Sequence, residues 1–383
     1  MKFFEELPLA EEILHLILLK QEGSFWDFKK QWYSNNTDLL HDIICMSNNL
    51  DNHTGYIIIG IDEEQDYLAV DVSNDPNRRN TQKLVDFLKD KKFAGGIRPV
   101  VHVENLNHSH GIIDIIVIEN SNNTPFYLTD KYEGVRANSI YTRVMDTNTP
   151  ITGSADINHV EQLWRKRFHL DDTPIEKFHY YLRKPDDWEE IQDTPMGYFY
   201  KYSPEYTITC EKDESANGYE YYIFGQRDTN PSWWLITLRY YQTAIEQFQG
   251  VALDGGRSFV VAPNRAYNPE NKEVSRFGFY IENDLRSRLL EFYHHKETCD
   301  EHSYAIYMTA VVVFESESEY KSFLNYVETN MKRYHSICSK MGTAGPPFFP
   351  DLPGRRMDTF EKEYKDALVM RQMLCEFRFR NKG

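Results

Sequence analysis

Apolar residues near the start of the chain recur at helical spacing over residues 5–21, and Gly23 follows where helices commonly stop. This pattern predicts a helix that leads into the stretch "EGSFWDFKKQW" at residues 22–32. If residues 24–32 are extended, Trp26 and Phe28 point to one face of the strand. Asp27 and Lys29 then share the opposite face.

The alternation of apolar and polar segments continues to about residue 172. Asn36 or Thr37 is expected to cap a helix within "NNTDLLHDIICMSNNL", and "GYIIIGIDEE" (55–64) is typical of a buried strand with an acidic end. We expect further helices at 79–92 and 156–169, and extended segments at "TPFYL" and "GVRANSIYTRVM". The segments "IRPVVHVENL" and "GIIDIIVIEN" predict a hairpin. These elements predict a mixed-sheet α+β domain over residues 1–172, ending near "DDTP".

The remaining residues, 173–383, are richer in aromatic side chains. The segments "MGYFYKYSPEYTITCE", "GYEYYIFGQ" and "SWWLITLRYYQ" predict an antiparallel sheet, and most of these rings are expected to pack in a core. Helices are predicted at 318–338 and 357–377, separated by the loop "GTAGPPFFPDLPG". We therefore expect a second α+β domain, with a role in sensing, substrate selection or oligomerisation.

Charge and composition limit the classes of partner that the chain is expected to bind. Its 383 residues carry a formal net charge of −16, which argues against a protein that coats nucleic acid without specificity. A local basic groove remains compatible with this charge, and its candidate residues are Lys29, Lys30, Lys89, Lys91, Lys92, Arg98, Arg136, Arg143, Arg165, Lys166 and Arg167. No apolar stretch is long enough for a membrane span, and five scattered cysteines favour a reducing compartment. We expect a cytoplasmic protein without a membrane partner.

Acidic residues at strand ends are the main candidates for chemistry in the first domain. Glu22, Asp27 and Asp62, with Glu63 beside the last, could supply carboxylates from neighbouring elements. Converging carboxylates bind Mg²⁺ or Mn²⁺, and such ions stabilise the charge that develops when a phosphodiester is cut. Lys29 could hold the attacking water or the phosphate. Taken one by one, the same acids are more often ordinary strand-end and turn residues.

Several short motifs in the correct order resemble the Schlafen AlbA-type domain over about residues 18–169. They are "EGSFWDFKK", "DIICMSNN", "GYIIIGIDEE", "IIDIIVIENSNNTPFYL" and "GVRANSIYTRV". Nuclease members of that family cleave structured RNA, notably transfer RNA, with a metal site of three carboxylates. By position, the resemblance implies that Glu22, Asp27 and either Asp62 or Glu63 bind the metal, with Asp27 where the family usually has Glu.

The sequence departs from the family pattern at two places. The family's Gly-Gly before its strand is replaced within "NNLDNHTG", and Met145-Asp146 stand where Gly-Ser follows the late Arg-Val pair. A phosphate cradle of backbone N–H groups is therefore less favoured, which weakens a nucleotide-sensing function.

The leading hypothesis from the sequence is a metal-dependent endoribonuclease acting on transfer RNA or similar structured RNA, in the setting of bacterial or antiphage defence. The expected catalytic residues are Glu22, Asp27, Lys29 and Asp62, with Mg²⁺ or Mn²⁺ held by the three acids. The expected contacts to the RNA backbone come from Lys30, Arg136, Arg143, Arg165, Lys166 and Arg167. The alternative is a non-catalytic nucleic-acid-binding or nucleotide-sensing regulator. Because the sequence has one Schlafen AlbA-like domain, a homodimer could bring two such domains together into a two-lobed cleft.

One other cluster has metal-binding residue types. The stretch "YHHKETCDEHSY" places His294, His295, Cys299 and His302 close together, but at no standard zinc-finger spacing. A polar loop between a helix and a strand is the expected reading.

Overall fold

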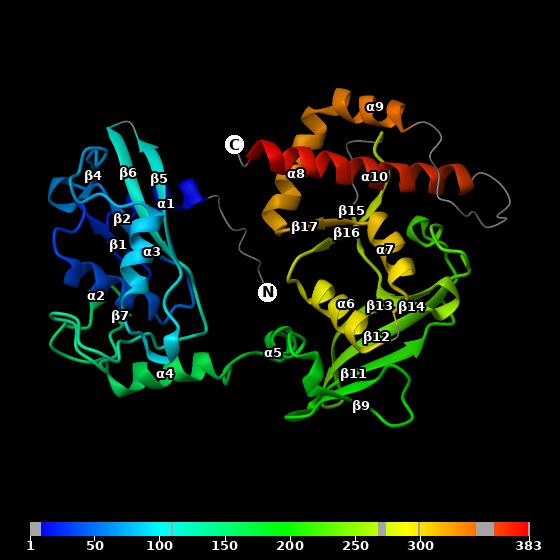
Figure 1. Cartoon of the computed structure of the whole chain (residues 1–383), viewed down its shortest axis with the longest axis horizontal. Coiled ribbons are helices and arrows are strands. Elements are labelled where there is room, and N and C mark those ends of the chain that lie inside the picture. Colours follow the sequence, from blue (N-terminus) through cyan, green and yellow to red (C-terminus); the bar gives the residue numbers. More distant parts are fainter. Residues whose placement is uncertain (1–8, 109, 267–272, 298, 342–355, 382–383) are drawn as a thin grey trace. The chain divides into compact units, whose positions relative to one another are not determined.

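The computed structural model describes residues 9–108, 110–266, 273–297, 299–341 and 356–381. The chain divides into two compact units, Met1–Asp172 and Thr173–Gly383. Each unit combines helices with sheets (Figure 1), so the predicted α+β class is confirmed.

A four-stranded mixed sheet forms the centre of the N-terminal unit. Its strands are β1 (Trp26–Lys29), β2 (Gly55–Ile59), β6 (Gly111–Ile118) and β5 (Val101–His108), in that order. Strand β1 pairs parallel to β2, with Asp27 opposite Ile57 and Lys29 opposite Ile59. The pairs β2–β6 and β5–β6 are antiparallel, and β5 and β6 form the predicted hairpin.

Each face of this sheet supports its own core, because side chains of β2 alternate between the faces. Ile57 and Ile59 belong to a core with the apolar residues of α2 (Asn36–Ser47) and α3 (Thr81–Lys89). Tyr56 and Ile58 belong to a second core, which includes Trp26 and Phe28 of β1 and residues of α1 (Leu9–Leu18). The strand at 55–59 is buried along its whole length, as its sequence predicts.

Strand β2 ends at a glycine that redirects the chain. Gly60 has a φ of +105°, and after it β3 (Ile61–Asp62) pairs with β4 (Leu68–Ala69). A Cβ added at Gly60 would lie 2.7 Å from the carbonyl oxygen of Val70. The predicted strand at 55–64 is therefore two short strands separated by a bend.

Gly60→Ala is expected to destabilise the N-terminal unit by about 1–3 kcal/mol. A positive φ is strained for alanine, and the added Cβ would clash with the Val70 carbonyl. Hydrogen exchange of peptides from residues 9–172, measured along a series of denaturant concentrations, gives the change in the free energy of unfolding. Gly96→Ala is the comparison, since Gly96 also has a positive φ of 70° but an added Cβ there meets nothing within 4 Å. Equal losses in the two variants would show that the close approach to Val70 is unimportant.

The end of the N-terminal unit is less regular than its sequence predicts. Of the extended segments expected at 124–145, only β7 (Arg143–Val144) forms a regular strand, paired with β8 (Thr147–Asn148), besides isolated bridges at Phe93–Leu128 and Tyr132–Val135. The cap of α2 is Asn35, whose side chain accepts from the Thr37 N–H, and not Asn36 or Thr37. The predicted helix at 156–169 is confirmed as α4 (Ile157–Arg167).

The C-terminal unit contains the predicted antiparallel sheet, with six strands in the order β14-β13-β12-β11-β10-β9. These strands are β9 (Trp188–Glu190), β10 (Tyr198–Tyr200), β11 (Ser203–Lys212), β12 (Ser232–Tyr240), β13 (Thr243–Leu253) and β14 (Ser258–Val261). A second sheet contains β15 (Asn264–Ala266), β16 (Phe277–Ile281) and β17 (Val312–Phe314). The segment "GYEYYIFGQ" is not a strand, because Tyr221–Ile223 form a 3-10 turn with buried rings.

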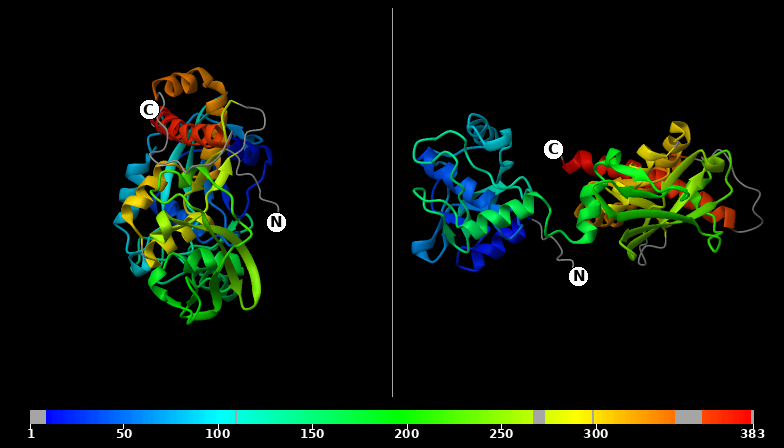
Figure 2. Two further views of the ribbon diagram at one scale, coloured as in Figure 1. Left: turned by 90° about the vertical axis from the view of Figure 1, so that its right-hand side faces the viewer. Right: turned by 90° about the horizontal axis from the view of Figure 1, so that it is seen from below.

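Helices complete the C-terminal unit. They are α5 (Pro174–Tyr181), α6 (Leu285–Lys296), α7 (Glu301–Thr309), α8 (Glu317–Thr329), α9 (Met331–Lys340) and α10 (Arg356–Asn381). The long helix α10 packs against β16, α8 and α9, and the views of Figure 2 show it beside these elements from two further sides. The predicted loop at 342–354 lies outside the described residues. In the part of the chain that the structure describes, every helix is too short or too polar to cross a membrane.

Candidate functional site

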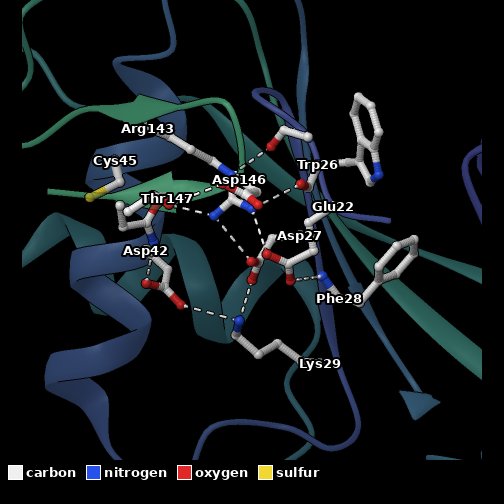
Figure 3. Close-up of polar contacts among 12 residues, drawn as sticks. Glu22, Trp26, Asp27, Phe28, Lys29, Asp42, Cys45, Arg143, Asp146 and Thr147 are labelled. Carbon is white, nitrogen blue, oxygen red and sulfur yellow. Dashed lines mark hydrogen bonds and ion pairs between the residues drawn. The ribbon is translucent and has the colours of Figure 1, made fainter. Parts of the chain in front are cut away.

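Strand β1 brings an acidic and a basic side chain to the same face of the sheet. Asp27 and Lys29 point toward α2, whereas Trp26 and Phe28 point away from the polar cluster (Figure 3). This is the alternation that an extended strand imposes. Asp27 is almost fully buried, with 4% of its side chain exposed, while Lys29 keeps 33% exposed. Lys29 forms an ion pair with Asp27.

Arg143 of β7 joins this strand to the preceding loop. Its Nη2 lies 2.8 Å from Glu22 Oε2, and its Nη1 lies 3.1 Å from Asp27 Oδ1. Its Nε donates to the carbonyl of Gly23 at 2.7 Å. Figure 3 shows the guanidinium group beside both carboxyl groups, with a contact to each. Arg143 thus holds Glu22 and Asp27, which lie on opposite ends of a short turn, in one cluster.

The placement of Arg143 differs from the expectation of a contact to the RNA backbone. Only 2% of its side chain is exposed, because the two carboxyl groups and the Gly23 and Trp26 carbonyls surround the guanidinium. A phosphate would have to displace those partners. The structure gives Arg143 the two acids and backbone carbonyls as partners, and its contact to RNA stays a prediction.

Sequence reasoning missed Asp42, which comes from α2. Its carboxyl group lies 3.9 Å from Lys29 Nζ, and it accepts hydrogen bonds from the Tyr33 hydroxyl at 2.7 Å and from Asn148 at 2.9 Å. The signal in the sequence was the position of Asp42 between Leu40 and Ile43 on the expected helix, since a charged residue that such a helix buries requires a partner.

Burial and mutual repulsion make Glu22 unusual among the acids of this unit. Burial, together with its hydrogen bond to Asp27 and the charge of Asp27, raises the pKa of Glu22 to about 7. The backbone N–H of Phe28 and the Arg143 side chain act in the opposite direction. Burial lowers the pKa of Lys29, but the carboxylates of Asp27, Asp42 and Glu22 outweigh it, so the pKa is raised. The cluster therefore combines a carboxyl group that titrates near neutral pH with a permanent ammonium group.

Asp62 lies in a different setting from the Glu22–Asp27 pair. It caps a 3-10 turn at Glu63–Gln65, accepting from the Glu64 N–H at 3.2 Å, and its Oδ2 lies 2.7 Å from Lys30 Nζ. Glu63, the other acid considered for this role, is exposed. Within the described ranges, no three His, Cys, Asp or Glu side chains are arranged to hold a metal ion.

The fit of the acids to Mg²⁺ or Mn²⁺ can be tested on two oxygen atoms. Asp27 Oδ2 and Asp62 Oδ2 are buried and accept no hydrogen bond, which is a setting that a cation would satisfy. However, an ammonium group already forms an ion pair with each oxygen, from Lys29 to Asp27 and from Lys30 to Asp62. As placed, the acids do not form the three-carboxylate centre that the resemblance implies. The metal expectation stays a prediction.

The remaining predicted contacts to RNA lie at several places on the N-terminal unit. Arg136 is exposed, and Lys30 is 55% exposed but pairs with Asp62. On α4, Arg165 pairs with Asp171, and Arg167 donates to the carbonyl of Asn123 at 2.7 Å. Burial lowers the pKa of Lys166 to about 8, and its ammonium group donates to Asn120 at 2.7 Å. The cations of α4 are thus engaged within their own unit.

The histidine and cysteine cluster at 293–304 does not form a four-ligand site. His295 pairs with Asp186 at 3.0 Å, and His302 is exposed, whereas His294 and Cys299 contact each other at 3.1 Å. The histidines diverge because His294 and His295 are successive residues on α6 and point to different sides of it. The cluster is a Cys–His pair and not a zinc ligand set among the described residues.

The fold and this charged cluster define the class of the N-terminal unit: a mixed-sheet α+β domain with a cluster of acidic and basic side chains on the face of β1 that points toward α2. Residues 22–152 match the family model described as Schlafen, AlbA_2, so the resemblance stated from the sequence is confirmed for this part of the chain. The family indicates a function related to nucleic acids. The matched segment includes Glu22, Asp27, Lys29, Asp62 and Arg143. No curated protein and no solved structure matches the chain.

Proposed function

We propose that the N-terminal unit is an endoribonuclease that cleaves structured RNA, such as transfer RNA, at the Glu22–Asp27 pair. The observation that carries this proposal is the pairing of Glu22, whose pKa is raised to about 7, with the partly exposed ammonium group of Lys29 across Asp27. Proton acceptors work best when their pKa lies near the operating pH. The family match supports nucleic acid as the substrate class.

In the reaction that we propose, a ribose 2′-hydroxyl attacks, and Glu22 and Lys29 are the side chains that assist it. The Glu22 carboxylate takes the proton of that hydroxyl. The ribose 2′-oxygen then attacks the neighbouring phosphorus. The bond from phosphorus to the 5′-oxygen breaks, water protonates the leaving oxygen, and Glu22 returns its proton to the solvent. Lys29 donates hydrogen bonds to the phosphoryl oxygens, where negative charge increases. The products are a 2′,3′-cyclic phosphate and a 5′-hydroxyl.

Asp27 and Arg143 support these two groups without touching the RNA. Asp27 lies between the Arg143 guanidinium and the Lys29 ammonium, so it fixes the position of Lys29. Arg143 orients Glu22 through the contact of 2.8 Å. A second candidate function, binding of nucleic acid without cleavage, is favoured by the deep burial of Asp27 and Arg143, which neutralise each other.

The test incubates the full chain with total transfer RNA, with Mn²⁺ or with EDTA, and determines the ends of any fragments. We expect discrete fragments with 2′,3′-cyclic phosphate ends in both conditions, and no cleavage by the Glu22→Gln and Lys29→Met double variant. RNA with 2′-O-methyl groups should resist cleavage because it lacks the attacking hydroxyl. Glu64→Gln is the matched control, since Glu64 is an exposed acid of the same unit.

Each other outcome has a defined meaning. EDTA-sensitive fragments with 5′-phosphate ends would overturn attack by the 2′-hydroxyl and support the metal-dependent route instead. Intact RNA that is bound equally by the wild type and the double variant would overturn the nuclease and support the binding function. A homodimer stays a prediction, which the mass of the active species in solution tests.

A further inference from the structure

The C-terminal unit contains a second pair of reactive groups that the proposed nuclease does not use. His294 lies in the last turn of α6, and Cys299 lies directly before Asp300, the N-cap of α7. Cys299 Sγ is 3.1 Å from His294 Nδ1. We assign to the neutral pair the tautomer in which Nδ1 accepts from the thiol and Nε2 carries the ring proton. A thiol and an imidazole in this contact form a nucleophile and its base.

Neighbouring side chains fix the orientation of the imidazole. His294 Nε2 faces Glu301 Oε1 at 3.8 Å, and the ring stacks on Tyr304 with centroids 4.2 Å apart. Glu301 is largely exposed, so its contact is weak, and the stacking of Tyr304 is the stronger constraint. The ring is thereby held with Nδ1 toward the thiol.

The chain around Cys299 is tied to the six-stranded sheet. The Asp300 N–H donates to Ser258 Oγ of β14 at 2.9 Å, and Ser258 Oγ in turn lies 3.7 Å from Cys299 Sγ. Ser258 is buried, with 1% exposed, while Cys299 is partly exposed. Cys299 is thus partly exposed in the connection between α6 and α7, and contacts to Ser258 tie that connection to β14.

We propose that Cys299 is a redox modification site, at which hydroperoxides oxidise the thiol to a sulfenic acid with His294 as the proton acceptor. His294 takes the thiol proton, the sulfur attacks one peroxide oxygen, and the O–O bond breaks. The leaving hydroxide takes the proton back from His294 and departs as water. The sulfur loses two electrons, and the peroxide gains them.

One observation favours oxidation over transfer of an acyl group. An acyl transfer site needs free N–H donors for the oxyanion, but the amides of Asp300 and Ser303 near the thiol already donate to Ser258 and Asp300. Burial raises the pKa of Cys299, so in either reaction the thiol keeps its proton at neutral pH until a neighbouring base removes it. Reaction with a peroxide requires only that base and access to the sulfur.

The experiment exposes the full chain to hydrogen peroxide with dimedone, which traps sulfenic acids, and quantifies each cysteine by mass spectrometry. Cys375 is the internal reference, because it is exposed on α10. We expect Cys299 to be labelled at least about tenfold faster than Cys375, and His294→Asn to remove that difference. His295→Asn is the matched control, since His295 is the adjacent residue and contacts Asp186 instead.

Labelling of Cys299 no faster than Cys375 would overturn the proposal. Unchanged labelling in a folded His294→Asn variant would overturn the role of His294. Hydrogen exchange of peptides from α6 and α7 establishes that the variant is folded. Glu301→Gln is a second, milder variant, which removes the charge that faces His294 Nε2 and should slow labelling only slightly. RNA cleavage by the N-terminal unit plays no part in these outcomes.

Discussion

Arg143→Met is expected to lower the free energy of unfolding of the N-terminal unit by about 3–5 kcal/mol, because removal of one partner leaves buried charges without compensation. Methionine fills a similar volume, so little of the loss comes from a cavity. What remains is the Glu22–Asp27 pair without the guanidinium group that contacts both carboxyl groups. Two close carboxylates in a buried setting repel each other strongly.

This loss should depend on pH in a defined direction. Glu22 has a raised pKa of about 7, so at pH 5.5 it is already protonated and the carboxyl pair carries one charge instead of two. The penalty of Arg143→Met should therefore be smaller at pH 5.5 than at pH 8.5. Hydrogen exchange of peptides from residues 9–172, measured along a urea series, isolates this unit from the C-terminal one.

Arg136→Met is the matched comparison, because Arg136 is the same residue type at an exposed position of the same unit. It should change stability by less than about 0.5 kcal/mol. If the two variants lose equal stability, the ion pairs of Arg143 contribute nothing to the fold, and its assignment as a positioning residue is wrong.

The regular elements of both units could be predicted because local patterns determine them. The strand at 55–59, the hairpin at 101–118 and the helix at 157–167 have unambiguous periodicity and turn signals. Segments held by side-chain contacts were predicted less well. Tyr221 and its neighbours read as a strand from their aromatic residues, but the Tyr221 hydroxyl donates to the distant Ala310 carbonyl, and the segment forms a 3-10 turn.

The candidate site divides in the same way between local and long-range information. The alternation of Trp26, Asp27, Phe28 and Lys29 depends only on the strand, and it follows from the sequence. The roles of Arg143 and Asp42 depend on which charges meet after folding: Arg143 is separated from Glu22 by 121 positions along the chain. The sequence shows Arg143 only as an arginine in an extended segment. Because most arginines lie at the surface, this pattern predicts an exposed side chain.

The separation of Asp62 from the pair has a backbone cause that a motif does not reveal. The positive φ of Gly60 turns the chain before Asp62, and Lys30 then meets this carboxylate instead of the Glu22–Asp27 pair. Position in a motif therefore predicts the presence of an acid near the strand end. It does not predict which cation the acid faces.

Glu22→Gln is expected to lower the rate of RNA cleavage by about 10²–10⁴-fold, the usual contribution of a positioned general base. Only the ionised carboxylate accepts a proton, and the pKa of Glu22 is about 7. The wild-type rate should therefore increase tenfold per pH unit below about 7 and level off above it. The variant should lose this inflection, whereas Glu64→Gln should keep both the rate and the profile. A Glu22→Gln enzyme that is slow but retains the inflection would show that another group is the base.

The same titration should affect stability in the opposite direction, which separates a catalytic defect from a folding defect. The pKa of Glu22 is raised from its usual 4.5, so the folded state binds the proton more tightly than the unfolded state. The resulting stabilisation is complete below pH 4.5 and is lost as the pH rises through about 7. The wild-type unit should thus become more active and less stable across the same pH range, and Glu22→Gln should flatten both profiles. A variant that flattened only the activity profile would show that the carboxyl group reaches its raised pKa in the RNA complex and not in the free protein.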